Sequence, residues 1–121
     1  MIGITANKAQ LHRYVSQKYE IMEPYHKAKQ QALKAQMVLN DHAMPSYKKV
    51  HHSLLAFKGM VLSSIPSKTQ KSVESVMLRN QQVLNRYPIR TFEDYQLISE
   101  EELNEILLNI SGLCTEILKL K

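Results

Sequence analysis

Three features of this 121-residue sequence predict an all-α fold, a single antiparallel bundle of four to five helices. Apolar residues recur along most of the chain with the 3.6-residue period of an amphipathic helix. No stretch alternates apolar and polar residues as a half-buried strand does, and no Asn-Gly or Asp-Gly pair marks a hairpin. The connections between the periodic stretches are short, as they are between neighbouring helices of a bundle. We therefore expect residues 1–121 to form one helical-bundle domain.

The first periodic stretch covers residues 5–40 and contains a proline. A stripe of apolar residues from Leu11 to Met22 precedes Pro24, and a second stripe follows it. A proline inside a helix removes a hydrogen bond and clashes with the preceding turn, at a cost of about 3 kcal/mol. Two helices meeting at Pro24 and one long helix kinked there both fit this pattern, and the kink is slightly favoured. The second stripe is rich in alanine, which lets a neighbouring helix approach closely: Tyr25, Ala28, Ala32, Ala35 and Leu39.

Two further helices are expected in the middle of the chain. The first begins at Ser46 and runs to about Ser63, and the second follows Pro66 and is stopped by Pro88. The core side of the first is expected to contain Tyr47, Val50, Leu54, Phe57 and Val61. The core side of the second is expected to contain Val73, Val76, Met77, Asn80, Val83, Leu84 and Tyr87.

The last helix has the clearest signals in the sequence. A link over residues 91–99, with room for a single turn at Phe92–Leu97, precedes it. Ser99 and Glu102 have the spacing of a capping box, in which the serine caps the helix and the glutamate reaches back. A wide apolar side predicts that this helix is the strongest packing element of the fold: Leu103, Ile106, Leu107, Ile110, Leu113, Cys114, Ile117 and Leu118.

Charge is unevenly distributed along the chain. Sixteen Lys and Arg against eleven Asp and Glu give a net charge of +5 and a pI of about 9.4. Residues 1–90 carry fourteen basic and four acidic residues, a net +10, whereas residues 91–121 carry two basic and seven acidic residues, a net −5. This asymmetry predicts a basic surface for an anionic partner and an acidic C-terminal segment.

Two expected helix faces carry basic residues without acidic ones. Along the helix expected between Pro66 and Pro88, Lys68, Arg79 and Arg86 share a face with Ser75 and Gln82. After Pro24, the residues Lys27, Gln30, Gln31 and Lys34 line up likewise. Such faces can contact phosphates, and they are also the ordinary solvated faces of amphipathic helices. Lysines at expected helix starts, beside free backbone N–H groups, suggest anion binding. The predicted binding residues are Lys27, Lys34, Lys48, Lys49, Lys68, Lys71, Arg79 and Arg86.

A second apolar side is expected on the helix that begins at Ser46, here counted as the third helix, opposite Leu54 and Phe57. It contains Ala56, Gly59 and Met60, and small residues allow two helices to approach closely. These three residues are therefore predicted to form a helix–helix contact inside the bundle or a contact between two copies of the chain.

Few residues suggest chemistry. The five histidines do not show the spacing of a metal site, and Cys114 lies among aliphatic residues, where a cysteine acts as a small hydrophobe. No phosphate-binding loop or nucleophile motif is present. We predict no catalytic residue, no metal site and no cofactor. No apolar stretch reaches the ~20 residues that span a bilayer, and no signal peptide is recognisable, so a cytoplasmic protein without membrane insertion is expected.

The sequence thus favours a small non-enzymatic protein-binding module, of the inhibitor or adaptor type, with a basic body and an acidic C-terminal segment. Another protein is the expected partner, and a homodimer is an additional prediction. The alternative is a helical protein that binds nucleic acid through its basic helix faces. Steep loss of affinity with salt distinguishes the second hypothesis from the first.

Overall fold

The computed structural model describes residues 25–121, and regular structure in this range is entirely helical. Four α-helices are present: α3 (His26–Leu39), α4 (Ser46–Leu55), α5 (Ser67–Leu84) and α6 (Glu100–Leu118). Two short 3₁₀ segments, η1 (Leu62–Ser64) and η2 (Phe92–Leu97), lie in the connections. The prediction of an all-α protein is confirmed for these residues. The predicted kink at Pro24 and the first apolar stripe lie outside the described residues.

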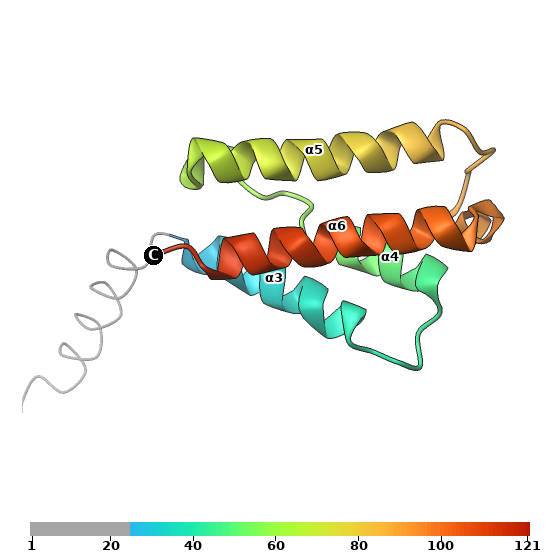
Figure 1. Cartoon of the computed structure of the whole chain (residues 1–121), viewed down its shortest axis with the longest axis horizontal. Coiled ribbons are helices and arrows are strands. Elements are labelled where there is room, and N and C mark those ends of the chain that lie inside the picture. The colour runs from blue at the N-terminus through green and yellow to red at the C-terminus, as the bar shows by residue number, and fades with distance from the viewer. Residues whose placement is uncertain (1–24) are drawn as a thin grey trace, which may run out of the picture.

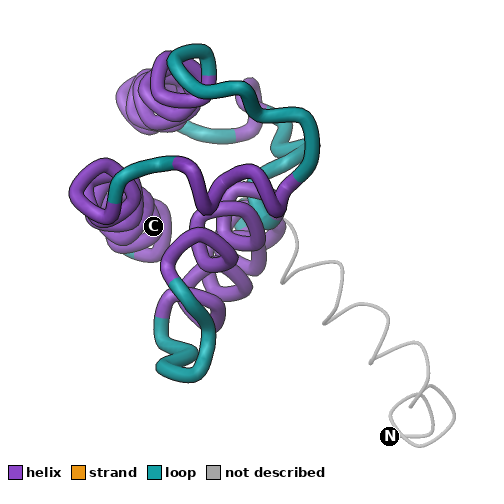
Figure 2. The backbone as a smooth tube through the Cα atoms, turned by 90° about the vertical axis from the view of Figure 1, so that its right-hand side faces the viewer, coloured by secondary structure: helices purple, strands orange, loops and turns teal. Residues whose placement is uncertain are grey.

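The helices pack around α6. Figure 1 shows α5 along one side of α6 and running in the opposite direction, with α3 and α4 on the other side. Helix α6 contacts α3, α4 and α5, and α3 also contacts α4. Helix α5 packs mainly on α6 and on η1, and the end view separates it from the α3–α4 pair (Figure 2). No helix within residues 25–121 is long and apolar enough to cross a membrane.

Helix α6 begins and packs largely as the sequence predicts. The Ser99 side chain accepts a hydrogen bond from the Glu102 backbone N–H at 3.2 Å. Three glutamates in the first turn suit the positive end of the helix dipole. The apolar side is confirmed as the centre of the core, with six buried members: Leu103, Ile106, Ile110, Leu113, Cys114 and Ile117. The Glu102 carboxylate was expected to accept a hydrogen bond from the Ser99 backbone. Instead it accepts hydrogen bonds from the side chains of Arg86 and Tyr87, in the segment before α6.

The alanine stripe of α3 is also confirmed. Ala28, Ala32 and Ala35 are all buried, and α3 contacts both α6 and α4. Alanine has no side chain beyond Cβ, so the spacing between packed helices is smaller where it lines the contact. The stripe therefore lets one short helix lie against two neighbours.

Helix α4 ends eight residues earlier than predicted. It stops at Leu55 rather than near Ser63, and the chain continues in single turns to Gly59, which has φ +81°. Glycine adopts this left-handed conformation without steric cost and commonly ends helices. The early end removes Val61 from the predicted core side, and its side chain is 62% exposed. Val50 and Phe57 of that side are buried as predicted.

The link before α6 contains the single turn that the sequence suggests, at Phe92–Leu97. Its start is held by the Asp94 carboxylate, which accepts hydrogen bonds from the backbone N–H groups of Arg90 at 2.8 Å and Thr91 at 3.1 Å. These bonds hold the pKa of Asp94 below its usual value. Tyr95 and Ile98 are buried, so the link is part of the core and fixes where α6 begins.

We predict that Ile110→Ala destabilises the protein by about 2–5 kcal/mol, because the side chain is fully buried and the substitution leaves a cavity. Leu108→Ala, on the same helix but 73% exposed, is the matched control and should change stability by no more than about 0.5 kcal/mol. Denaturant midpoints measure both. Equal midpoints for the two variants would contradict the central position of α6.

Candidate functional site

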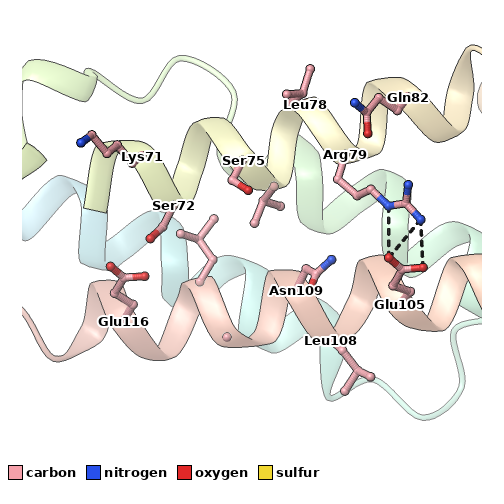
Figure 3. Close-up of a pocket in the computed structure, with 13 residues that line it drawn as sticks. Lys71, Ser72, Ser75, Leu78, Arg79, Gln82, Glu105, Leu108, Asn109 and Glu116 are labelled. Carbon is pink, nitrogen blue, oxygen red and sulfur yellow. Dashed lines mark hydrogen bonds and ion pairs between the residues drawn. The ribbon is translucent and has the colours of Figure 1, made fainter. Parts of the chain in front are cut away.

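A groove of about 810 Å³ runs between α5 and α6 (Figure 3). It exists because short side chains occupy the positions where the two helices face each other. Ser72 and Ser75 line it from α5, and Gly112 lines it from α6. A Cβ atom added at Gly112 would meet no atom within 4 Å, so this part of the groove is open space. Half-buried Val76 and buried Leu113 add apolar surface to the lining.

Two exposed leucines flank the groove. Leu78 of α5 is 61% exposed, and Leu108 of α6 is among the most exposed large apolar residues described. In Figure 3 they point away from each other, each beyond its own helix. A solvated leucine gains free energy when a partner covers it, because burial removes apolar surface from water. The groove thus combines a hollow of small residues with apolar surface on both sides.

Charged groups of both signs line the groove. The Arg79 guanidinium donates from Nε to Glu105 Oε1 and from Nη2 to Glu105 Oε2, both at 3.1 Å. This hydrogen bonding, followed by the charge of Glu105, raises the pKa of Arg79. Lys71 of α5 and Glu116 of α6 line the groove further along (Figure 3). The lining is therefore mixed in charge rather than uniformly basic.

A second ion pair joins the end of α5 to the start of α6. Arg86 Nη2 donates to Glu102 Oε2 at 2.6 Å, and the Tyr87 hydroxyl donates to Glu102 Oε1 at 2.8 Å. Both predicted arginines of the α5 basic face thus bind glutamates of α6. Lys68, the third basic residue of this predicted face, is exposed in the first turn of α5.

The basic face of α3 lies elsewhere. Lys27, Lys34, Gln30 and Gln31 line a cavity of about 670 Å³ between α3 and the connection from α4 to α5. The described residues around this cavity include no Asp or Glu. The structure therefore keeps Lys27 and Lys34 together, apart from Lys71 and Arg79 in the groove. Lys48 and Lys49 lie in the first turn of α4 and line neither cavity.

The prediction of a small-residue face on the helix that begins at Ser46 is wrong, because this helix ends at Leu55. Ala56, Gly59 and Met60 lie beyond the end of α4, in the turns that follow Leu55, and so do not share a helix face. A Cβ atom at position 59 would meet no atom within 4 Å, so no helix of the described residues packs closely against Gly59 on that side. Contact of these residues with a second copy stays a prediction.

Groups capable of chemistry are not gathered at the groove. No cluster of three or more His, Cys, Asp or Glu suited to a metal ion occurs within residues 25–121. Cys114 is buried, and burial raises the pKa of its thiol to about 11. His51 stacks on Phe92 with ring centroids 5.0 Å apart, and its pKa is lowered by burial and then by the charge of His52. Cys114 is thus a core residue, as the sequence predicts.

Leu78 and Leu108 were not predicted as functional residues. Each is a single large apolar residue on an otherwise polar helix face: Leu78 beside Glu74, Ser75, Gln81 and Gln82, and Leu108 beside Asn104, Glu105, Ser111 and Gly112. That isolation is the signal by which they could have been found. Their placement on opposite sides of one groove follows from the packing of α5 on α6 and not from either helix alone.

We predict that Cys114 makes stability fall with alkaline pH. The ordinary thiol pKa is 9.0, so between pH 9 and 11 the unfolded chain loses this proton while the folded protein keeps it. The stabilising contribution, of order 2 kcal/mol, is complete below pH 9 and is lost as pH rises to about 11. Cys114→Ala removes it. The difference in unfolding free energy between wild type and Cys114→Ala should therefore shrink as pH rises from 9 to 11. A difference that stays constant over this range would contradict the burial of the thiol.

No protein-family model matches the chain, and searches of curated proteins and of solved structures find no match. The function of this protein is therefore inferred from its own surface.

Proposed function

We propose that this protein is a non-enzymatic protein-binding module, of the inhibitor or adaptor type, and that the α5/α6 groove receives a helical segment of the partner. The observation that carries the proposal is the groove itself. Helices dock into grooves through apolar residues on one face, and the docking is closest where the receiving surface has small side chains. Ser72, Ser75 and Gly112 supply such a surface here.

The flanking leucines support the same proposal. A helix seated over Gly112 would lie between Leu78 and Leu108, whose side chains point outward beyond the two walls, so a segment wide enough to overlap both walls would cover them. Covering two largely exposed leucines contributes about 25 cal/mol for each Å² of apolar surface removed from water. The small side chains of the groove would set how closely the partner helix approaches α5 and α6. The leucines would contribute much of the affinity.

Charge along the groove supports specificity. The Arg79–Glu105 pair is solvent-exposed, with side chains 38% and 49% accessible, and exposed ion pairs add little to stability. Arg79 or Glu105 can therefore leave this pair and bind an oppositely charged residue of a docked segment. Lys71 and Glu116 provide a second pair of opposite charges. We expect the partner segment to carry charges of both signs, which would fix its direction in the groove.

Nucleic-acid binding is the second candidate, and one observation favours it. Lys27 and Lys34 line the α3 cavity without a described acidic neighbour in its lining, so their charge is available to phosphates. Arg79 and Arg86 favour the first candidate, because each lies against a glutamate of α6 whose negative charge repels phosphates. The protein-binding function is therefore the better supported of the two.

Gly112→Leu tests the groove without threatening the fold. Leucine fills open space and has a higher helix propensity than glycine by roughly 0.5–1 kcal/mol, so the variant should be at least as stable as wild type. Ser111→Leu is the matched control, since Ser111 is exposed on the same helix and does not line the groove. A protein partner captured from nuclease-treated extract should bind wild type and Ser111→Leu equally and Gly112→Leu at least tenfold more weakly. Equal binding by all three would contradict the proposal.

Salt dependence separates the two candidates. A nucleic-acid binder loses affinity for duplex DNA linearly on a log–log plot against salt, and Lys27→Gln with Lys34→Gln should reduce the slope by about one unit for each lost contact. Under the protein-binding proposal, retention on duplex DNA is weak and Gly112→Leu leaves it unchanged. Tight, steeply salt-dependent binding that depends on the two lysines would favour the second candidate instead.

A further inference from the structure

The two walls of the α5/α6 groove carry opposite charges. Among the described residues that line it, α5 contributes Lys71 and Arg79 and no acidic residue. Helix α6 contributes Glu105 and Glu116 to the described lining, and no basic residue. Figure 3 shows Lys71 across from Glu116 near one end of the groove, with the Arg79–Glu105 pair toward the other end. Each end therefore has a positive group on the α5 wall and a negative group on the α6 wall.

The face that contains this groove is largely solvent-exposed. Ser75, Asn109 and Gly112 line the groove and are all exposed. Leu78 and Leu108, which are 61% and 73% exposed, project beyond the outer edges of α5 and α6 (Figure 3). Both edges of the face thus carry apolar surface that would gain free energy by leaving water.

The size of this face is sufficient for a weak protein interface. Helix α5 has 18 residues and is about 27 Å long, and two packed helices are together about 18–20 Å wide. Each copy of the chain therefore presents on the order of 500 Å² in projection. Two such faces would bury on the order of 1,000 Å², close to the smallest area typical of a specific interface.

Charge decides how two copies of this face can meet. Identical faces can be related by a two-fold axis in the plane of the interface, either across the groove or parallel to it. An axis across the groove places α5 on α5 of the second copy, so that like charges meet. An axis parallel to the groove places α5 on α6 of the second copy. Lys71 then faces the partner's Glu116, and Arg79 faces the partner's Glu105, so that opposite charges meet at both ends.

The parallel axis also brings the exposed leucines together. The outer edge of α5 lies against the outer edge of the second copy's α6, which places Leu78 near the partner's Leu108 on each side of the dimer. The hydrogen bonds between Arg79 and Glu105 within each chain need not break. The four charged groups of the two pairs alternate in sign around the axis, so each arginine lies between two glutamates.

We infer that two copies of this chain pack α5 and α6 face to face about a two-fold axis parallel to the groove, and that this dimer covers the groove until a partner segment displaces the second copy. The second part rests on the proposed function, in which a partner helix occupies the same groove. Self-association thus regulates access to the groove, because the second copy and the partner compete for one surface.

Dilution of the full chain tests for the dimer. Sedimentation equilibrium from low-micromolar to near-millimolar concentration should show a reversible equilibrium between monomer and dimer, because the interface is small. Added salt should weaken the dimer, since the charged groups that meet across it are exposed and are screened.

Charge reversal tests the arrangement. Arg79→Glu places a glutamate opposite the partner's Glu105, and Glu105→Arg places an arginine opposite the partner's Arg79. Each variant alone should dimerise roughly tenfold or more weakly than wild type. An equimolar mixture of the two variants restores opposite charges at both contacts. It should therefore form a one-to-one heterodimer about as tightly as wild type forms its homodimer, which native mass spectrometry of the mixture measures.

Lys58→Glu is the matched control, because Lys58 is exposed, does not line the groove and undergoes the same change of charge. It should dimerise as wild type does. Circular dichroism checks the fold of each variant, and an exposed ion pair adds little to stability. If either reversal fails to fold, Lys71→Glu and Glu116→Lys repeat the test at the other end of the groove.

Two results would overturn the inference. The first is a wild-type monomer at every concentration, whether residues 1–24 or a different protein then occupies the groove. The second is a dimer that neither reversal weakens, or a mixture that binds no more tightly than the single variants. The proposed function fails separately. A monomer whose capture of a partner depends on Gly112 leaves that function in place, whereas a dimer without Gly112-dependent capture contradicts it.

Discussion

The buried face of α6 is the contact on which the rest of the structure depends. Its six buried residues belong to the helix that packs extensively against α3, α4 and α5, the broadest set of contacts among the described helices. Apolar burial of this kind is the dominant favourable term in folding. Helices α3 and α4 also support each other, whereas α5 relies mainly on α6. The position of α5 is therefore set by one interface and by the links at its two ends.

The candidate sites follow from that arrangement. Because α5 packs mainly on α6, both of its remaining sides are partly open. On one side it forms a wall of the groove with α6, and on the other it forms a wall of a cavity of about 430 Å³ with α4. The Arg79–Glu105 pair crosses from α5 to α6 at the groove, and the Arg86–Glu102 pair joins the turn after α5 to the first turn of α6. They place the basic and acidic segments of the chain against each other. The charge asymmetry of the sequence is thereby partly neutralised within the fold.

Much of the fold was predictable because local patterns determine it. The alanines of α3, the Ser99 cap and the apolar side of α6 each identify a helix face without reference to the rest of the chain. The end of α4 was not predictable from periodicity, because apolar spacing continues past Leu55 and the left-handed conformation of Gly59 interrupts it. The groove was not predictable either. Gly112 and Ser75 lie 37 positions apart in the sequence, and only the packing of two helices brings them to one surface.

Native-state hydrogen exchange measures most directly whether α6 holds the other helices. Amide protection reports the free energy of the opening that exposes each group, and it approaches the global unfolding value in the most stable elements. We predict that amides of Ile106, Ile110 and Ile117 exchange only through global unfolding. Amides in the middle of α5, such as that of Met77, should exchange through a smaller opening that leaves α6 protected. Protection in α5 equal to that in α6, or faster exchange in α6 than in α3 and α4, would contradict this account.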